Sequence, residues 1–249
     1  MLKIDSGDFA TGASLAAVRA RSLAEQVADS IVDGIAAGIL IPGQRVLELE
    51  LARQLQVSRV PVREALRSLG AQGILESAPH RGTHIADFDQ VSVERISEVR
   101  IALEKIAVRH AMNTYASSPD QLGKLDLIIE AMKRCVENQD WVGVNKADVD
   151  FHREICAASR NEIVITLWEA LARHVLIIFG REILSKAARS RIVDQHRRLR
   201  RLLKTGDPKQ LEAEVGRHIM GLRRLRSGKR GPVQESSMRR SRSVQTDIP

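Results

Sequence analysis

Residues 57–69, VSRVPVREALRSL, combine a helix start with an apolar stripe and a row of arginines. If Ser58 is the N-cap, Pro61 takes the third helical position, where its missing amide hydrogen costs nothing. The apolar side chains recur at helical spacing and must pack on a core: Val62, Leu66 and Leu69. A different face of the same helix carries Arg59, Arg63 and Arg67. A solvated basic face would explain these arginines as well as a binding face does, so the flanking sequence has to decide.

The sequence around this helix predicts a winged helix-turn-helix. A short helix expected over 48–55 precedes it across a tight turn at 56–58, and in such an arrangement the second helix is free to enter the major groove of DNA. A longer helix is expected over 14–38, and the Pro-Gly pair at 42–43 follows it. Two extended segments, 74–77 and 83–86, flank a turn-rich tip. The tip contains His80, Arg81 and Gly82 and is suited to contact a phosphate or the minor groove beside the helix.

The remainder of the chain predicts an all-helical domain. Helical periodicity continues from residue 92, with breaks near 117–120, 138–141, 159–161 and 205–208. Aromatic residues make up only 3% of the chain, while the abundant Ala and Leu favour helices over strands, so we expect a mainly α fold. The expected organisation is a flexible arm (1–13), the winged helix-turn-helix domain (14–88), the helical domain (92–226) and a disordered basic tail (227–249). Both a solubilising role and contact with phosphates remain open for this tail.

The charge of the chain points to a polyanionic partner. Lys and Arg number 39 against 31 Asp and Glu, a formal net charge of +8, which favours nucleic acid or an anionic membrane surface. No apolar run approaches the length of about 18 residues that spans a bilayer, and the first residues lack a secretory signal. We therefore expect a cytoplasmic protein with no membrane partner. Cys135 and Cys156 have neither metal-site nor disulfide-framework spacing and are expected to be small core residues.

A second group of residues has the chemistry of a metal site. Asp148 and His152 are four residues apart, so they project from one face of a helix, although either alone is more commonly a surface or core group. His196 and His218 lie on the two arms of an expected helical hairpin that turns at Gly206. With a rise of about 1.5 Å per residue, both lie roughly 15–18 Å from the turn. This spacing is compatible with a site for a divalent ion such as Zn²⁺ or Ni²⁺ inside the bundle, but it does not require one.

The basic helix and its surroundings resemble the GntR family of bacterial transcription regulators. The family's DNA-binding domain reads roughly pG..L.E..LA..L.VSR.PVREAL..L...G, and the chain matches this pattern over 39–82, including VSR at 57–59 and PVREAL at 61–66. The resemblance implies phosphate and base contacts from the basic helix and the wing. The residues expected at the DNA are Arg45, Ser58, Arg59, Val60, Pro61, Arg63, Arg67, His80, Arg81 and Gly82. Family members often carry an arginine where this chain has Leu49, so base preference is expected to differ. Glu64 is expected to orient Arg63 or Arg67, or to make a contact within the domain.

Residues 93–225 resemble the FCD effector domain that follows such DNA-binding domains in the FadR subfamily. The recurring elements are R..LE..A, matched at 100–107, then D..FH, matched at 148–152, and two later histidines. The resemblance implies metal ligation by Asp148, His152, His196 and His218, with a small organic acid completing the shell. Arg100 then becomes a candidate partner for the acid's carboxylate, or a structural partner of Glu104. His174, on an apolar helix expected over 163–178, either faces the same cavity or is a core histidine.

Together these patterns predict a DNA-binding transcription regulator and not an enzyme. We expect a homodimer on a double-stranded operator, with its affinity controlled by a small carboxylate effector and a divalent metal in the helical domain. Two alternatives remain open: a metal-dependent hydrolase-like enzyme that uses the same Asp/His site, and a metal-free regulator that senses an acyl ligand. The predicted winged helix has no role in a hydrolase, and the sequence contains no known catalytic motif, which argues against the enzyme. The histidines argue against the metal-free regulator.

Overall fold

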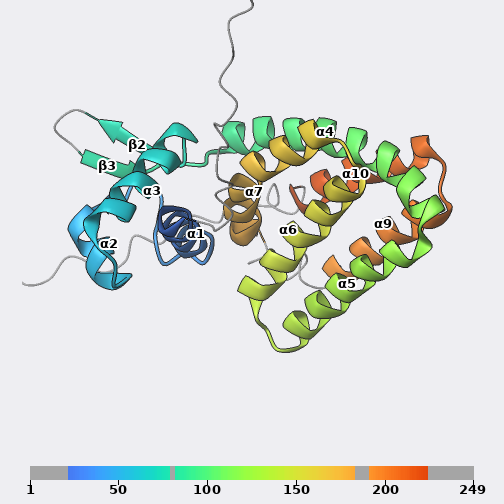
Figure 1. The fold of residues 1–249 in the computed structure, drawn as a ribbon, viewed down its shortest axis with the longest axis horizontal. Coiled ribbons are helices and arrows are strands. Elements are labelled where there is room, and N and C mark those ends of the chain that lie inside the picture. Colours follow the sequence, from blue (N-terminus) through green and yellow to red (C-terminus); the bar gives the residue numbers. More distant parts are fainter. Residues whose placement is uncertain (1–21, 79–81, 183–190, 224–249) are drawn as a thin grey trace, which may run out of the picture.

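The computed structural model describes residues 22–78, 82–182 and 191–223. The predicted arm at 1–13, the predicted tail at 227–249, and His80 and Arg81 lie outside these ranges. The N-terminal part consists of α1 (Leu23–Ala36), β1 (Arg45–Val46), α2 (Glu48–Gln54), α3 (Arg59–Ala71), β2 (Leu75–Ala78) and β3 (Gly82–Ile85). It is followed by α4 (Gln90–Ser117), the 3-10 helix η1 (Pro119–Gln121), α5 (Leu122–Glu137), α6 (Trp141–Ala158), α7 (Glu162–Glu182), α9 (Ile192–Thr205) and α10 (Pro208–Arg223). The predicted mainly α fold is confirmed, and Figure 1 shows the two parts side by side, with the long α4 running along the helical part.

The helix-turn-helix forms largely for the reasons that its sequence suggests. Val62 and Leu69 of α3 are completely buried, and α3 starts directly after Ser58, which places Pro61 at the third helical position. The Ser58 hydroxyl, however, makes no capping hydrogen bond, contrary to our expectation. An N-cap side chain accepts from the amide of the second or third helical residue, and the proline at the third position has no amide hydrogen to donate. The helix therefore begins where predicted, but without this cap.

The wing contains three strands, one more than predicted. The antiparallel sheet has the order β1-β3-β2, and β1 pairs Arg45 with His84. Two residues are too few for an alternating pattern, which is why β1 was missed. Gly82 has a φ of +81°, and a Cβ atom there would lie 3.0 Å from Nε of Arg45. The absence of a side chain at Gly82 thus leaves room for the Arg45 side chain next to the hairpin turn of the wing.

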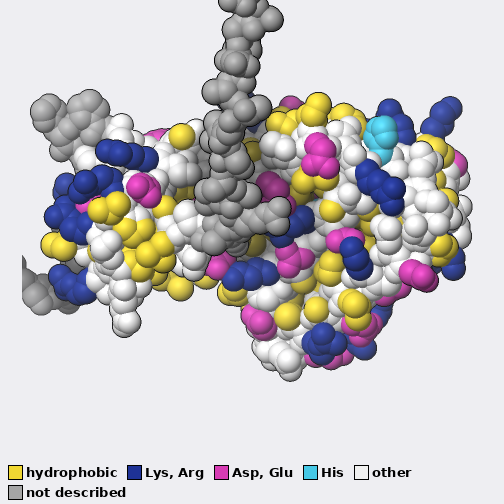
Figure 2. All heavy atoms as spheres, viewed as in Figure 1, with side chains coloured by type: hydrophobic (Ala, Val, Ile, Leu, Met, Phe, Trp, Pro, Cys, Tyr) yellow, Lys and Arg dark blue, Asp and Glu magenta, His cyan; other side chains and the backbone are white. Residues whose placement is uncertain are grey.

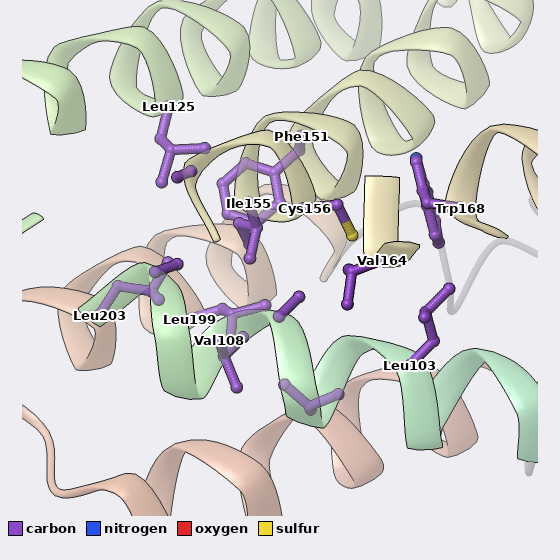
Figure 3. Packing of buried hydrophobic residues seen from close by; sticks show 14 of the residues in the cluster. Leu103, Val108, Leu125, Phe151, Ile155, Cys156, Val164, Trp168, Leu199 and Leu203 are labelled. Atoms are coloured by element: carbon purple, nitrogen blue, oxygen red, sulfur yellow. The ribbon is translucent and has the colours of Figure 1, made fainter. Parts of the chain in front are cut away.

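The helical part buries one large apolar core, and its helices end close to the predicted breaks. α4 ends at Ser117, α6 begins at Trp141, and α9 and α10 meet at residues 206–207. Cys156 is buried in this core as expected, whereas Cys135 is only partly buried. Figure 3 shows how side chains from α4, α5, α6, α7 and α9 converge, among them Leu103, Val108, Leu125, Phe151, Ile155, Val164, Trp168, Leu199 and Leu203.

α7 connects the two parts because it packs in both of their cores. Val164 and Trp168, near its start, belong to the core of the helical part, whereas Ile177 and Ile178 belong to the core formed by α1, α3 and the sheet. Near its end, Gly180 comes so close to α1 that an added Cβ atom would lie 2.6 Å from the carbonyl oxygen of Ala36. The N-terminal and helical parts therefore share a continuous packed contact.

The prediction that no segment has the length and apolarity of a membrane span is wrong for α7. Within the described residues, Glu162–Gly180 meets both criteria, and 44% of this segment is buried inside the protein. The core helix of a protein can meet the same criteria, and α7 packs against α1, α4 and α6. Its apolar character thus has a packing explanation in the structure.

The close approach of α7 to α1 can be tested by adding one methyl group. We expect Gly180→Ala to lower the free energy of unfolding by about 1–3 kcal/mol, because the new Cβ would meet backbone atoms that cannot rotate away. Gly123→Ala is the matched control, since nothing lies within 4 Å of a Cβ atom on that exposed helical residue. The control should be neutral or stabilising by up to about 1 kcal/mol. Equal melting temperatures for the two variants, measured by circular dichroism, would contradict the close packing at Gly180.

Candidate functional site

The structure brings Asp148, His152, His196 and His218 together in the interior of the helical part. The first two project from α6, His196 from α9 and His218 from α10. Each residue is at most 2% exposed. One potential ligand atom from each lies within 4.8 Å of the others. We predicted that His196 and His218 lie at similar distances from the turn between their helices. In the structure the two rings are in contact, with centroids 4.7 Å apart.

In His152 and His196, Nδ1 forms a hydrogen bond outside the cluster, and Nε2 therefore points into the cluster. Nδ1 of His196 donates to the carbonyl oxygen of Ile192 at 2.8 Å, and Nδ1 of His152 donates to Oε2 of Glu104 at 2.6 Å. In the neutral rings, Nε2 then carries a lone pair. The lone pair of His152 Nε2 accepts the hydrogen bond from Nε2 of His218 at 3.0 Å, and the lone pair of His196 Nε2 lies 3.1 Å from Oδ1 of Asp148. Several electron-pair donors therefore converge on one small volume.

Burial and charge favour the protonation states that metal ligands need. Burial lowers the pKa of His152 and His218, which keeps both rings neutral. Burial opposes the ionisation of Asp148, but the adjacent His196, His152 and Arg100 outweigh it and hold the pKa of this carboxyl below its usual value. Among the described residues, both carboxylate oxygens of Asp148 and Nε2 of His196 lack hydrogen-bond partners. Buried acceptors without partners are costly, and a divalent cation would satisfy this set of one carboxylate and three imidazoles.

Arg100 and Glu104 on α4 form a second layer around the cluster. Nε of Arg100 donates to Oε1 of Glu104 at 2.7 Å, so the structural pair that we considered for Arg100 is present. The other end of the guanidinium, NH2, lies 3.7 Å from Oδ2 of Asp148 and has no hydrogen-bond partner. The bond between Glu104 and His152 was not predicted. The R..LE..A motif contains Glu104, but a separation of 48 residues gives no indication that it touches His152.

His174 does not join the cluster and lies at the contact between the two parts of the protein. Its Nε2 donates to the carbonyl oxygen of Gln72, the C-cap residue of α3, at 2.9 Å. The neighbouring Arg173 donates to Oδ1 of Asp29 on α1 at 3.0 Å. Trp168 faces the cluster, with its ring centroid 6.0 Å from that of His152. His174 lies six residues after Trp168, so the two side chains point about 120° apart around the helix axis, which explains why His174 is directed away from the cluster.

A pocket lies beside the cluster on the side of α9 and α10. It has a volume of about 360 Å³ and is lined by Arg191, Asp194, Gln195, Arg198, Glu214, Arg217 and His218. Three arginines in this lining outnumber its two carboxylates. Nδ1 of His218 and Oε1 of Gln195 are buried without a hydrogen-bond partner in the described part of the chain. The pocket therefore joins a basic lining to one of the four clustered residues.

A second candidate surface lies at the start of α3. The side chains of Arg59 and Arg63 are 59% and 49% exposed, and Ser58, Val60 and Arg67 are exposed as well. Figure 2 shows Lys and Arg side chains gathered at the end of the molecule where α2, α3 and the sheet lie. Pro61 is buried, so its ring serves the core of the domain. Exposed arginines at a helix start are suited to phosphates and base edges.

Glu48, at the start of α2, binds both of these arginines. Its Oε1 accepts from Nε of Arg59 at 2.8 Å and from NH2 of Arg63 at 2.9 Å, while its Oε2 accepts from Nε of Arg63 at 3.1 Å. The bond from Arg63 lowers the pKa of the Glu48 carboxyl. We expected Glu64 to orient an arginine, but it forms no ion pair within the described residues. Sequence spacing identifies a partner on the same helix, whereas the helix-turn-helix crossing brings Glu48 close from another one.

The comparisons with known proteins agree in both parts of the chain. Residues 23–85 match the family model of bacterial regulatory proteins of the gntR family, and residues 95–221 match the FCD domain. The chain is 35% identical over 198 residues to the "probable D-xylose utilization operon transcriptional repressor" of Paenarthrobacter nicotinovorans, which covers 80% of this chain and 86% of that protein. It is 26% identical to the HTH-type transcriptional regulator LutR of Bacillus subtilis, with 77% and 95% covered. The solved structure of McbR/YncC of E. coli shares the fold, with a TM-score of 0.72, 23% identity and coverage of 83% and 97%.

Proposed function

The chain belongs to the GntR family of bacterial regulatory proteins and carries an FCD domain, and from this premise we propose how its DNA binding is controlled. It is a transcriptional regulator, like its relatives, and not an enzyme. We assign it to the FadR subfamily and place it in the cytoplasm, beside the chromosome. In our proposal, a small organic acid, bound together with a divalent metal in the helical domain, changes the affinity of a homodimer for its operator.

One observation carries the metal part of the proposal: four buried potential ligands converge, with one ligand atom of each within 4.8 Å of the others. Metal-binding histidines commonly donate their second nitrogen to a carboxylate or a carbonyl, as His152 and His196 do with Glu104 and Ile192. An ion of the Zn²⁺ or Ni²⁺ type, when bound, would supply the positive charge that these acceptors lack and a coordination position for a carboxylate. A metal-free acyl-ligand regulator would leave the buried acceptors unexplained.

The surroundings of the cluster support an anionic effector. NH2 of Arg100 is buried without a hydrogen-bond partner and points toward the cluster, which makes it suitable for a carboxylate. The pocket beside His218 is lined by Arg191, Arg198 and Arg217. A small carboxylate would therefore find positive charge beside the metal ligands, and one more arginine than carboxylates in the neighbouring pocket, where Glu214 pairs with Arg198 and Arg217.

α7 supplies a physical connection from the cluster to the DNA-binding part. Near its start, the Trp168 ring lies against His152 and under the guanidinium of Arg100, 5.5 Å from its centroid. At its middle, Arg173 donates to Asp29 of α1, and His174 donates to the carbonyl oxygen of Gln72, the C-cap residue of the recognition helix. We propose that effector binding shifts α7 and thereby the recognition helices of the dimer on a pseudo-palindromic operator. Such coupling typically amounts to about 1–3 kcal/mol.

The DNA interface can be tested with Arg63→Ala. We expect operator affinity to fall by about 10–100-fold, because a base-contacting arginine is worth about 1–3 kcal/mol, and the salt dependence to become shallower. Affinity is measured by fluorescence anisotropy on the duplex that the wild-type protein selects from a random-sequence library. Arg153→Ala, which removes the same charge from α6, should bind normally. If Arg63→Ala retained full affinity, α3 would not be the recognition helix.

The metal site can be tested with the double variant His196→Ala/His218→Ala. We expect about one equivalent of metal per wild-type chain by elemental analysis and none in the double variant, whereas His110→Ala on the exposed face of α4 should retain it. Glu104→Gln should weaken Zn²⁺ binding by about 10–100-fold, because Glu104 orients His152. Retained stoichiometric metal in the double variant would refute the ligand set.

The role of α7 can be tested with Arg173→Ala. We expect the operator affinity of the wild-type protein to differ between its Zn²⁺-loaded and its chelated form. This difference should be smaller in the variant, because it lacks the hydrogen bonds of Arg173 to Asp29 and Gln72. Metal content should stay unchanged, which separates coupling from metal binding. Arg134→Ala, on the exposed surface of α5, serves as the control. A full response in Arg173→Ala would exclude these contacts as the route of coupling.

A further inference from the structure

The carboxylate of Glu48 is a negative charge within a surface that should attract DNA. We propose that Glu48 is a positioning residue for sequence recognition: it holds Arg59 and Arg63 in one orientation, so that their remaining N–H groups meet the bases in a defined register. The inference rests on the proposed role of these two arginines at the DNA. It adds a residue that makes no DNA contact itself but determines how well the protein distinguishes one sequence from another.

The hydrogen bonds leave both guanidinium groups free to bind DNA. Arg63 uses Nε and NH2 for Glu48, and Arg59 uses Nε. A guanidinium has five N–H donors, so each arginine keeps at least the two that a bidentate contact with guanine requires. Both side chains are also about half exposed or more, which leaves them accessible to a duplex. Glu48 thus orients the arginines without covering them.

Glu48 is better explained by orientation than by stability. Ion pairs between exposed side chains contribute little to folding, and both arginines are largely exposed. A free arginine has many rotamers, and ordering it on DNA costs conformational entropy. An arginine already held by Glu48 has lost part of that entropy before binding. Because one carboxylate binds both residues, it also sets the position of one guanidinium relative to the other.

The charge of Glu48 acts in the opposite direction on nonspecific binding. Phosphates dominate binding to any sequence, and a carboxylate near them is repulsive. Neutralising Glu48 should therefore weaken recognition of the operator while it leaves binding to other sequences unchanged or strengthens it. Neither a structural contact nor simple repulsion produces this divergence.

The experiment compares Glu48→Gln with Glu50→Gln in the full-length protein. Glu50 lies two residues further along α2, carries the same charge and accepts a hydrogen bond from Gln54. Affinities are measured over a range of salt concentrations on the duplex that the wild-type protein selects and on a scrambled duplex of equal length. We expect Glu48→Gln to lower the ratio of the two affinities by about tenfold, the order of magnitude of one well-oriented base contact. Glu50→Gln should change both affinities equally and leave their ratio as in the wild type.

Three results would overturn the inference. An unchanged ratio in Glu48→Gln would exclude a role in discrimination. A parallel loss of both affinities with a lower melting temperature would make Glu48 a structural link between α2 and α3, and a parallel gain would make it only a repulsive charge. In an Arg59→Ala/Arg63→Ala background, Glu48→Gln should not lower the ratio further, because the side chains that it positions are absent. Failure of the DNA-interface assignment is distinguishable, since Arg63→Ala would then bind the selected duplex normally.

Discussion

The packing of α7 in two hydrophobic cores is the constraint on which the arrangement of this regulator depends. Trp168 near one end is buried beside the Asp/His cluster, while Ile177 and Ile178 near the other end are buried with α1 and α3. A rigid helix held at both ends cannot shift in one core without disturbing the other, because close-packed interiors resist gradual deformation. This shared helix gives a chemical event in the helical domain a physical means of reaching the DNA-binding surface.

The Asp/His cluster is the most demanding part of the interior. A carboxylate and three imidazoles occupy positions with almost no exposure, and the surrounding protein satisfies only some of their polar atoms. Glu104 and the Ile192 carbonyl orient two of the rings, and Arg100 contributes a positive charge near Asp148. The buried acceptors that remain favour a cation more strongly than the presence of the histidines alone does.

The DNA-binding surface is governed by a different balance. Exposed arginines attract any phosphate backbone, so charge alone provides affinity without selectivity. Selectivity requires arginines that are oriented before they meet the bases, and Glu48 provides such orientation from the neighbouring helix. In our proposals, the two sites use a carboxylate differently: Asp148 would coordinate a metal ion, and Glu48 would orient the arginines that contact DNA.

The sequence alone determined the helices, the order of the two domains and the start of the recognition helix at Ser58, because caps, breaks and apolar periodicity act over a few residues. Helical spacing also related Asp148 to His152, and the hairpin turn related His196 to His218, whereas the resemblance to the FCD domain joined the two pairs into one group. Only the tertiary structure decided which side chains from different elements meet: Glu48 with the arginines, Glu104 with His152, and His174 with Gln72 instead of the cluster. Such contacts depend on the crossing and rotation of packed helices, and a local pattern of residues carries no record of them.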